Sequence, residues 1–137
     1  MGFRLGRQGN LLPIAVVLAA ACAACGEGEQ TASGPNIVAR SQKCTDTTVG
    51  KQRGATVTGS EWISGKFVVQ VADVFNCARH DLATPAYTAT GAEVSIRWAW
   101  KRPPDGPVAA CECERKLTFE LSGLKQDQYS VRLQRSE

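Results

Sequence analysis

Apolar side chains in this sequence recur at every second position, and this spacing favours β-strands. The clearest alternating set is Val94, Ile96, Trp98 and Trp100. Similar alternation covers 66–77, 111–121 and 129–133, with weaker strands expected at 37–40, 55–58 and 86–90. Nowhere do apolar residues recur at helical spacing over three turns. Short strands separated by turn residues predict an all-β chain: a single small antiparallel β-sandwich.

Two charged residues fall on apolar positions of this pattern. Asp73 interrupts the apolar face of 66–77, which predicts a β-bulge or the end of a sheet there. Arg115 does the same within 111–121. We expect a bulge, an edge strand, or a side chain whose charged head reaches solvent at that position.

A tyrosine opens the last predicted strand. Leu117–Leu124 is followed by four polar residues and then Tyr129. A strand, a short corner and a tyrosine resemble the tyrosine corner of immunoglobulin-like and fibronectin-type sandwiches, in which the phenol donates a hydrogen bond to upstream backbone. The resemblance implies a sandwich of immunoglobulin or fibronectin type. The alternative is that Tyr129 is an ordinary half-buried strand residue.

The first 24 residues have the organisation of an export signal. Arg4 and Arg7 precede a short apolar run at 11–21, and small residues then lead to Cys22 and Cys25. A cysteine after small residues resembles the lipobox of bacterial lipoproteins. We predict a cleaved signal at 1–24 and a lipid on Cys25, with Cys22 as the alternative acceptor and an ordinary signal cut without lipid as a third possibility.

The residues after the predicted cleavage define the rest of the domain plan. Residues 26–35 contain no large apolar side chain, so 25–35 is predicted to be the lipidated cysteine and a flexible linker, with the β-sandwich at 36–137. Removal of the signal leaves 14 basic and 13 acidic groups. A nearly neutral domain gives no electrostatic reason to expect a nucleic acid partner.

Four cysteines remain in the predicted domain: Cys44, Cys77, Cys111 and Cys113. An exported protein meets oxidising conditions, in which disulfides persist. Cys111 and Cys113 lie two residues apart on one strand, about 6.5 to 7 Å between Cα atoms, too far to bond each other in a regular strand. Each therefore needs Cys44 or Cys77, which leaves two connectivities open. We favour Cys77 with Cys111 and Cys44 with Cys113.

The same cysteines allow a metal-site alternative. Cys77, His80, Cys111 and Cys113 offer three thiolates and an imidazole, a ligand set that suits zinc or cuprous copper. The Cys-x-Cys spacing is a weak match to paired zinc knuckles. The main prediction is therefore structural disulfides, with no metal and no cofactor.

Enzyme motifs are lacking in the sequence. There is no Gly-x-Ser-x-Gly elbow and no phosphate-binding glycine loop. The chain is therefore predicted not to be an enzyme. Binding residues are sought among Trp62, expected beside a turn and exposed, and Lys101 with Arg102, which precede the loop Pro103–Pro107. Trp98 and Trp100 are expected in the core.

A longer pattern resembles one group of proteins. Cys77, then 91–96, Cys111-x-Cys113, 117–124 and Tyr129-x-Val131 are similar to small bacterial lipoproteins with a Cys…Cys-x-Cys…Gly-Leu…Tyr pattern. The resemblance covers about residues 66–134. It implies a small β-sandwich and a disulfide from Cys77 to the Cys-x-Cys strand, and it implies no activity.

These observations predict a non-enzymatic binding or structural module of a bacterial cell envelope. It would be held at the membrane by its N-terminal lipid, facing the periplasm or the cell exterior, with a protein or saccharide as its ligand. Two other functions remain open. One is a periplasmic zinc or copper protein using the four metal-site residues. The other is a secreted peptidase inhibitor presenting Pro103–Pro107.

Overall fold

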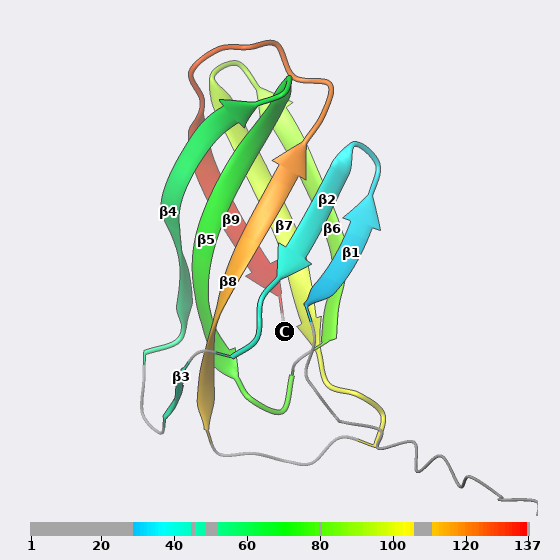
Figure 1. The fold of residues 1–137 in the computed structure, drawn as a ribbon, viewed down its shortest axis with the longest axis vertical. Helices are drawn as coiled ribbons and strands as arrows, with labels where there is room; N and C mark the ends of the chain where they lie inside the picture. Colours follow the sequence, from blue (N-terminus) through cyan, green and yellow to red (C-terminus); the bar gives the residue numbers. More distant parts are fainter. Residues whose placement is uncertain (1–28, 45, 49–51, 80, 106–110, 137) are drawn as a thin grey trace, which may run out of the picture.

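The computed structural model describes residues 29–136 apart from 45, 49–51, 80 and 106–110 (Figure 1). The described residues form nine strands and no helix. The strands are β1 (Gln30–Gly34), β2 (Ile37–Ser41), β3 (Asp46–Thr48), β4 (Gly54–Ile63), β5 (Lys66–Asn76), β6 (Asp81–Thr90), β7 (Glu93–Lys101), β8 (Glu112–Leu121) and β9 (Ser130–Ser136). Among these residues there is also no helix long and apolar enough to cross a membrane.

The strands form two packed sheets, so the predicted β-sandwich is confirmed. Sheet A has the order β1-β2-β8-β5-β4, with β3 also paired to β8, and sheet B has the order β6-β7-β9 (Figure 1). One pair departs from the predicted antiparallel arrangement, because β7 and β9 are parallel. The chain leaves β7, crosses to sheet A for β8, and crosses back. The two crossings bring β9 into sheet B in the direction of β7.

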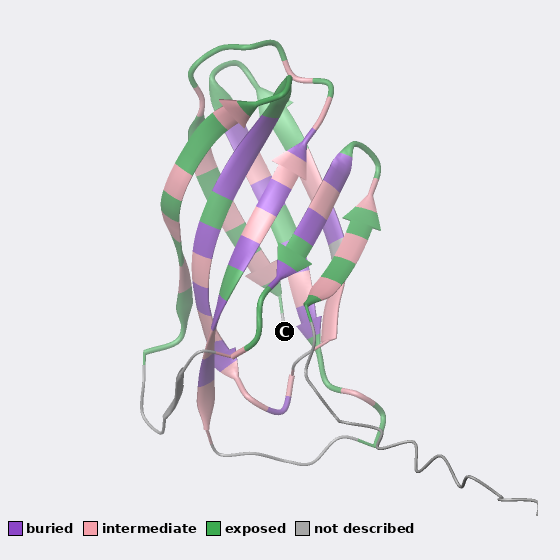
Figure 2. Cartoon of the chain, viewed as in Figure 1, coloured by how far each residue is buried: buried purple, intermediate pink, exposed green. Residues whose placement is uncertain are grey.

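The core lies between the sheets and uses the alternating positions of the sequence. Bands of buried and less buried residues follow one another along β5 and β8 (Figure 2). The largest apolar side chains with almost no exposure are Trp98, Trp100, Phe75, Phe119, Ile37 and Ile96. Burying such a side chain contributes about 1.5 to 3 kcal/mol, so these layers provide the main stabilisation of the sandwich.

Asp73 and Arg115 lie inside this core, and the predictions for both positions are wrong. The pairing of β5 with β8 runs without a break from Phe67 opposite Leu121 to Asn76 opposite Glu112, so neither position is a bulge. β8 is a central strand, and both charged residues are fully buried. The alternation of apolar residues shows which face of the strand a residue occupies. It does not show whether a charged side chain on the buried face has hydrogen-bonding or aromatic partners there.

Residues 30–34 are strand β1, so the predicted linker ends earlier than expected. β1 pairs with β2 along its whole length. At Gly34 the backbone of β1 lies so close to β6 that an added Cβ would overlap the carbonyl oxygen of Pro85. The glycine at position 34 therefore reflects close packing between the two sheets rather than flexibility. Residues 25–28 of the predicted linker lie outside the described residues.

A β-bulge in β4 reverses the facing of its side chains. Val57 pairs with Val71, but Gly59 pairs with Gln70, so Thr58 is an extra residue on β4. Before the bulge the odd-numbered residues face the core, and after it the even-numbered residues do. Trp62 consequently faces the core and Ile63 faces outward.

The two ends of the sandwich differ in their connections (Figure 1). The hairpin end carries the turns after β1, β4 and β6 and the segment 122–129. The disulfide end carries Cys44, Cys77, Cys111 and Cys113 together with the start of β1.

Candidate functional site

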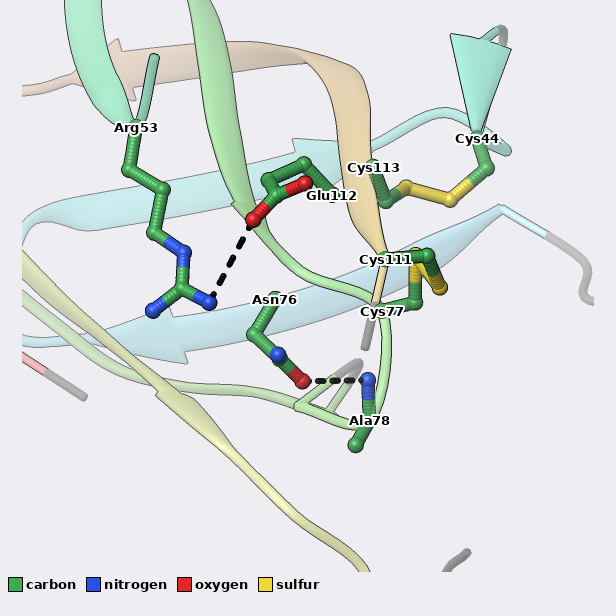
Figure 3. The surroundings of a disulfide bond; sticks show 8 residues. All are labelled: Cys44, Arg53, Asn76, Cys77, Ala78, Cys111, Glu112 and Cys113. Atoms are coloured by element: carbon green, nitrogen blue, oxygen red, sulfur yellow. Dashed lines mark hydrogen bonds and ion pairs between the residues drawn. A yellow bond between two sulfur atoms is a disulfide. The ribbon is translucent and has the colours of Figure 1, made fainter. Parts of the chain in front are cut away.

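Both disulfides join the Cys-x-Cys motif to other segments (Figure 3). Cys44 bonds Cys113 across a Cα–Cα distance of 5.6 Å, and Cys77 bonds Cys111 across 5.5 Å. The backbone N–H of Cys77 also donates to the carbonyl oxygen of Cys111 at 3.0 Å. The favoured connectivity is confirmed. Two disulfides indicate an extracytoplasmic protein, because reducing compartments keep thiols free.

The alternative metal site loses its thiolates in this structure. Cys77, Cys111 and Cys113 are all in disulfides, and a bridged sulfur is not a thiolate ligand. The fourth predicted ligand, His80, lies outside the described residues. The described part of the chain contains no group of three metal-ligating side chains.

A buried ionic network lies beside the disulfides. One oxygen of Asp73, Oδ2, accepts hydrogen bonds from Trp98 Nε1 at 3.1 Å and Trp100 Nε1 at 2.6 Å. The other, Oδ1, accepts from Arg135 Nη1 at 2.8 Å, and the same guanidinium nitrogen donates to the carbonyl of Val74 at 2.7 Å. Burial raises the pKa of Asp73, while Trp100, Arg135 and Trp98 act in the opposite direction.

Arg115 lies against aromatic rings in the same region. Its guanidinium carbon is 5.7 Å from the centre of the Phe75 ring and 5.5 Å from that of Trp100. These two rings stack with centres 4.0 Å apart. Cation–π contact partly offsets the cost of removing the charge from water. The buried charges are therefore built into the core and do not face a ligand site.

The predicted binding residues do not come together. Trp62 is half-buried rather than exposed, because the bulge turns it toward Phe67 and Tyr129, with ring centres 5.4 and 6.4 Å away. Its Nε1 donates to the carbonyl of Asp127 at 2.8 Å.

Lys101 and Arg102 are exposed, but they lie at the other end of the molecule. Lys101 closes β7, whereas Trp62 lies near Tyr129, beside the start of that strand. The nine residues of β7, which are eight steps along the strand, separate the two positions by about 26 Å. Of the loop that follows Arg102, only residues 103–105 are among the described residues.

Aromatic side chains hold the segment 122–129 at the hairpin end. Tyr129 Oη donates to the carbonyl oxygen of Lys125 at 3.0 Å, which confirms the predicted tyrosine corner. Tyr87 Oη donates to the carbonyl of Ser122 at 2.5 Å, a contact that sequence reasoning missed. Nothing in the local sequence links the two residues, because Tyr87 lies in sheet B and Ser122 follows the last residue of β8 in sheet A.

The outer face of sheet A carries a surface depression that sequence reasoning also missed. It has a volume of about 390 Å³, with Ile63 and Val68 as its apolar lining and Gln70, Thr118 and Glu120 among its polar lining. A second depression of about 500 Å³ shares Gln70 and Thr118 and extends to Lys116. One signal in the sequence could have indicated an apolar group on the outer face. Trp62 and Ile63 are neighbours in a strand, and neighbouring side chains face opposite sides, so one of the two must face outward.

An ion triad lies at the edge of the first depression. Glu120 accepts from Arg40 Nε at 3.2 Å and from Lys66 Nζ at 2.9 Å, so β8 is linked to β2 and β5. The hydrogen bond from Lys66 and then that from Arg40 hold the pKa of Glu120 below its ordinary value. The triad fixes three side chains on this face and carries one net positive charge.

No family model matches this chain, and neither does any curated protein or solved structure. The candidate site therefore depends on the geometry of this molecule alone. Among the described surfaces, the outer face of sheet A combines an apolar depression, oriented polar groups and fixed charges. This face is therefore the candidate site of the described part of the molecule.

Proposed function

We propose that this protein is a lipid-anchored module of the bacterial cell envelope that binds another envelope component through the outer face of sheet A. The observation that carries the binding role is the depression at Ile63 and Val68. Ile63 is 47 % exposed and is the one large hydrophobic residue exposed to that degree in the described chain. A concave surface that combines apolar lining with a few polar groups is typical of a binding site.

The anchor is proposed from the sequence, and the fold is compatible with it. The export pattern ends at Cys25, and β1 begins five residues later at the disulfide end. A lipid on Cys25 would hold the disulfide end toward the membrane. The depression lies at the opposite end of β5, about 30 Å along the strand from Asn76. The proposed contact site would therefore face away from the bilayer.

A binding role fits the described carboxylates better than catalysis does. Asp73 is the carboxyl with a raised pKa, but its oxygens are occupied by two indoles and a guanidinium, and it is fully buried. A general acid or base must reach a substrate proton. Asp73 is enclosed by its own partners and serves the core.

The intact mass of the exported protein tests the anchor. We expect a chain that begins at Cys25 and carries acyl groups, and that partitions into detergent. A Cys25→Ser variant should lose the adduct, while Cys22→Ser should keep it. An adduct that disappears only in Cys22→Ser would move the anchor, and an unmodified chain cut after an alanine would refute lipidation.

A further inference from the structure

The bulge at Thr58 determines which side chain the end of β4 presents outward. Without the extra residue, Ile63 would face the core and Trp62 would face solvent. With it, Ile63 lies on the outer face opposite Lys66 and beside Val68, which lines the depression and is only 6 % exposed. Bulges commonly re-aim a side chain at a functional surface. The outward position of Ile63 on this face therefore results from the β-bulge.

The outer face around the two depressions carries charges of both signs. The charged side chains on this part of the face are Arg40, Lys66 and Lys116 together with Glu61, Glu114 and Glu120. Glu120 is already held by two of the cations. Lys116 is exposed and makes no ion pair with any described residue. A partner that meets this face should therefore bring a carboxylate to Lys116.

The register fixes the spacing between the apolar and the charged feature. Val68 lies opposite Glu120, and Lys116 lies opposite Ala72 on the same pair of strands. Four residues of β5 separate the two positions, which is about 13 Å along the strand. Gln70 and Thr118 lie between them and line both depressions. An extended peptide covers the same distance in four residues.

We propose that this groove binds an extended peptide segment of another envelope protein. The segment places an aliphatic or aromatic side chain over Val68 and Ile63, and an aspartate or glutamate about four residues along at Lys116. The inference rests on the proposed binding role and names its partner. Uncharged amide and hydroxyl groups of Gln70 and Thr118 face the segment between these two contacts.

A peptide fits this surface better than a sugar chain does. Saccharide sites commonly stack a sugar on an aromatic ring, and the nearest candidate, Trp62, is turned inward with its Nε1 bound to Asp127. The exposed apolar contact of the groove is the aliphatic side chain of Ile63. An aliphatic surface with one free cation matches an apolar and acidic peptide.

Selection from a displayed library of random linear peptides on the purified exported protein tests the proposal. Enriched peptides should share an apolar residue and an acidic residue about four positions apart. Ile63→Thr keeps a β-branched side chain at an exposed site, and it should weaken binding of an enriched peptide about tenfold. Lys116→Glu should weaken it by a similar factor and remove much of its salt dependence.

A charge reversal on the other sheet provides the matched control. Arg132 is exposed on the outer face of sheet B, so Arg132→Glu should leave peptide binding unchanged. The proposal is overturned if no peptide is enriched, or if enriched peptides bind both groove variants as well as the parent protein. Binding of soluble peptidoglycan fragments that is lost in Lys116→Glu, without peptide binding, would overturn it in favour of a saccharide. Lipidation is read separately by mass, so a missing anchor and a missing ligand give different results.

Discussion

The two ends of this sandwich are stabilised by different interactions, covalent bonds at one end and hydrogen bonds at the other. At the disulfide end, two covalent bonds join the segments after β2 and β5 to the start of β8, and a buried ion pair joins β5 to the end of β9. At the hairpin end three connections are tight turns. The one long segment, 122–129, is held by three side-chain donors that bond backbone carbonyls: Trp62, Tyr87 and Tyr129.

The difference follows from the cost of closing loops. A tight turn joins strands that are already neighbours, so little chain entropy is lost and hydrogen bonds are enough. At the disulfide end, segments as far apart as Cys44 and Cys113 must meet, with a sequence separation of 69. Cross-links between distant segments remove more freedom from the unfolded chain and stabilise more. The comparison predicts that disruption costs more at the disulfide end.

The largest effect is expected from removing a disulfide. Replacing Cys44 and Cys113 together by alanine should lower the free energy of unfolding by about 4 kcal/mol, because a long closed loop is released. The Cys77–Cys111 disulfide spans a separation of 34 and lies inside the other, so replacing both of its cysteines by alanine should cost a similar amount. Denaturant unfolding of both variants measures the two losses. A loss below about 1 kcal/mol for either pair would contradict the cross-link account.

The next effect concerns the buried ion pair. Arg135→Met should destabilise the fold by about 3 kcal/mol, since Asp73 keeps its indole donors but loses its cation. Arg132→Met on the same strand, exposed on the other face, is the control and should change stability by less than about 0.5 kcal/mol. Equal losses in the two variants would show that Asp73 does not depend on Arg135.

The same variant has a pH signature with a definite sign. The folded-state pKa of Asp73 is raised above its ordinary 3.8, and Arg135 opposes that rise. Without Arg135 the folded pKa moves further up. A raised folded pKa means that stability is lost as pH rises through it. The deficit of Arg135→Met should therefore be smaller in acid than at neutral pH.

A smaller effect is expected at the hairpin end. Tyr129→Phe removes one hydrogen bond to the carbonyl of Lys125 and should cost about 1 kcal/mol. Tyr87→Phe removes the corresponding bond to Ser122 and provides a second measurement at the same end. Thermal unfolding would compare them. A loss equal to that of a disulfide would remove the distinction between the two ends.

The smallest effect is expected from the surface triad. Glu120→Gln should cost less than about 1 kcal/mol, because its partners Arg40 and Lys66 are both well exposed to solvent. The lowered pKa means that the contribution of Glu120 is present above the ordinary value of 4.5 and is lost as pH falls through the lowered one. Unfolding at low and high salt should show the contribution shrinking with salt.

The sequence predicted the parts of the fold that follow from local alternation. The core strands, the burial of Trp98 and Trp100, the tyrosine corner and the favoured disulfide pairing are all confirmed. Alternation identifies faces wherever a strand is regular. Cysteine spacing excludes a bond within the motif because strand geometry separates the two sulfurs.

The remaining features depend on contacts between distant segments. One extra residue at Thr58 reversed the facing of Trp62 and Ile63, and β-branched and small residues around it give no local sign of a bulge. The buried state of Asp73 depends on Trp98, Trp100 and Arg135 from the other sheet. The groove was missed for the same reason, since Ile63, Val68 and Lys116 become neighbours only through strand pairing.

The nested order of the disulfides affects how the protein must be made. Cys44 pairs with Cys113 around the inner pair Cys77 and Cys111, so Cys44 does not bond Cys77, the next cysteine along the chain. When a chain meets an oxidant amino end first, Cys44 and Cys77 are exposed together before their native partners arrive. A bond between them would have to be undone by thiol–disulfide exchange. The yield of correctly bridged protein then depends on whether Cys44 and Cys77 are oxidised before β8 is exported. A disulfide isomerase would raise that yield by breaking the wrong bond.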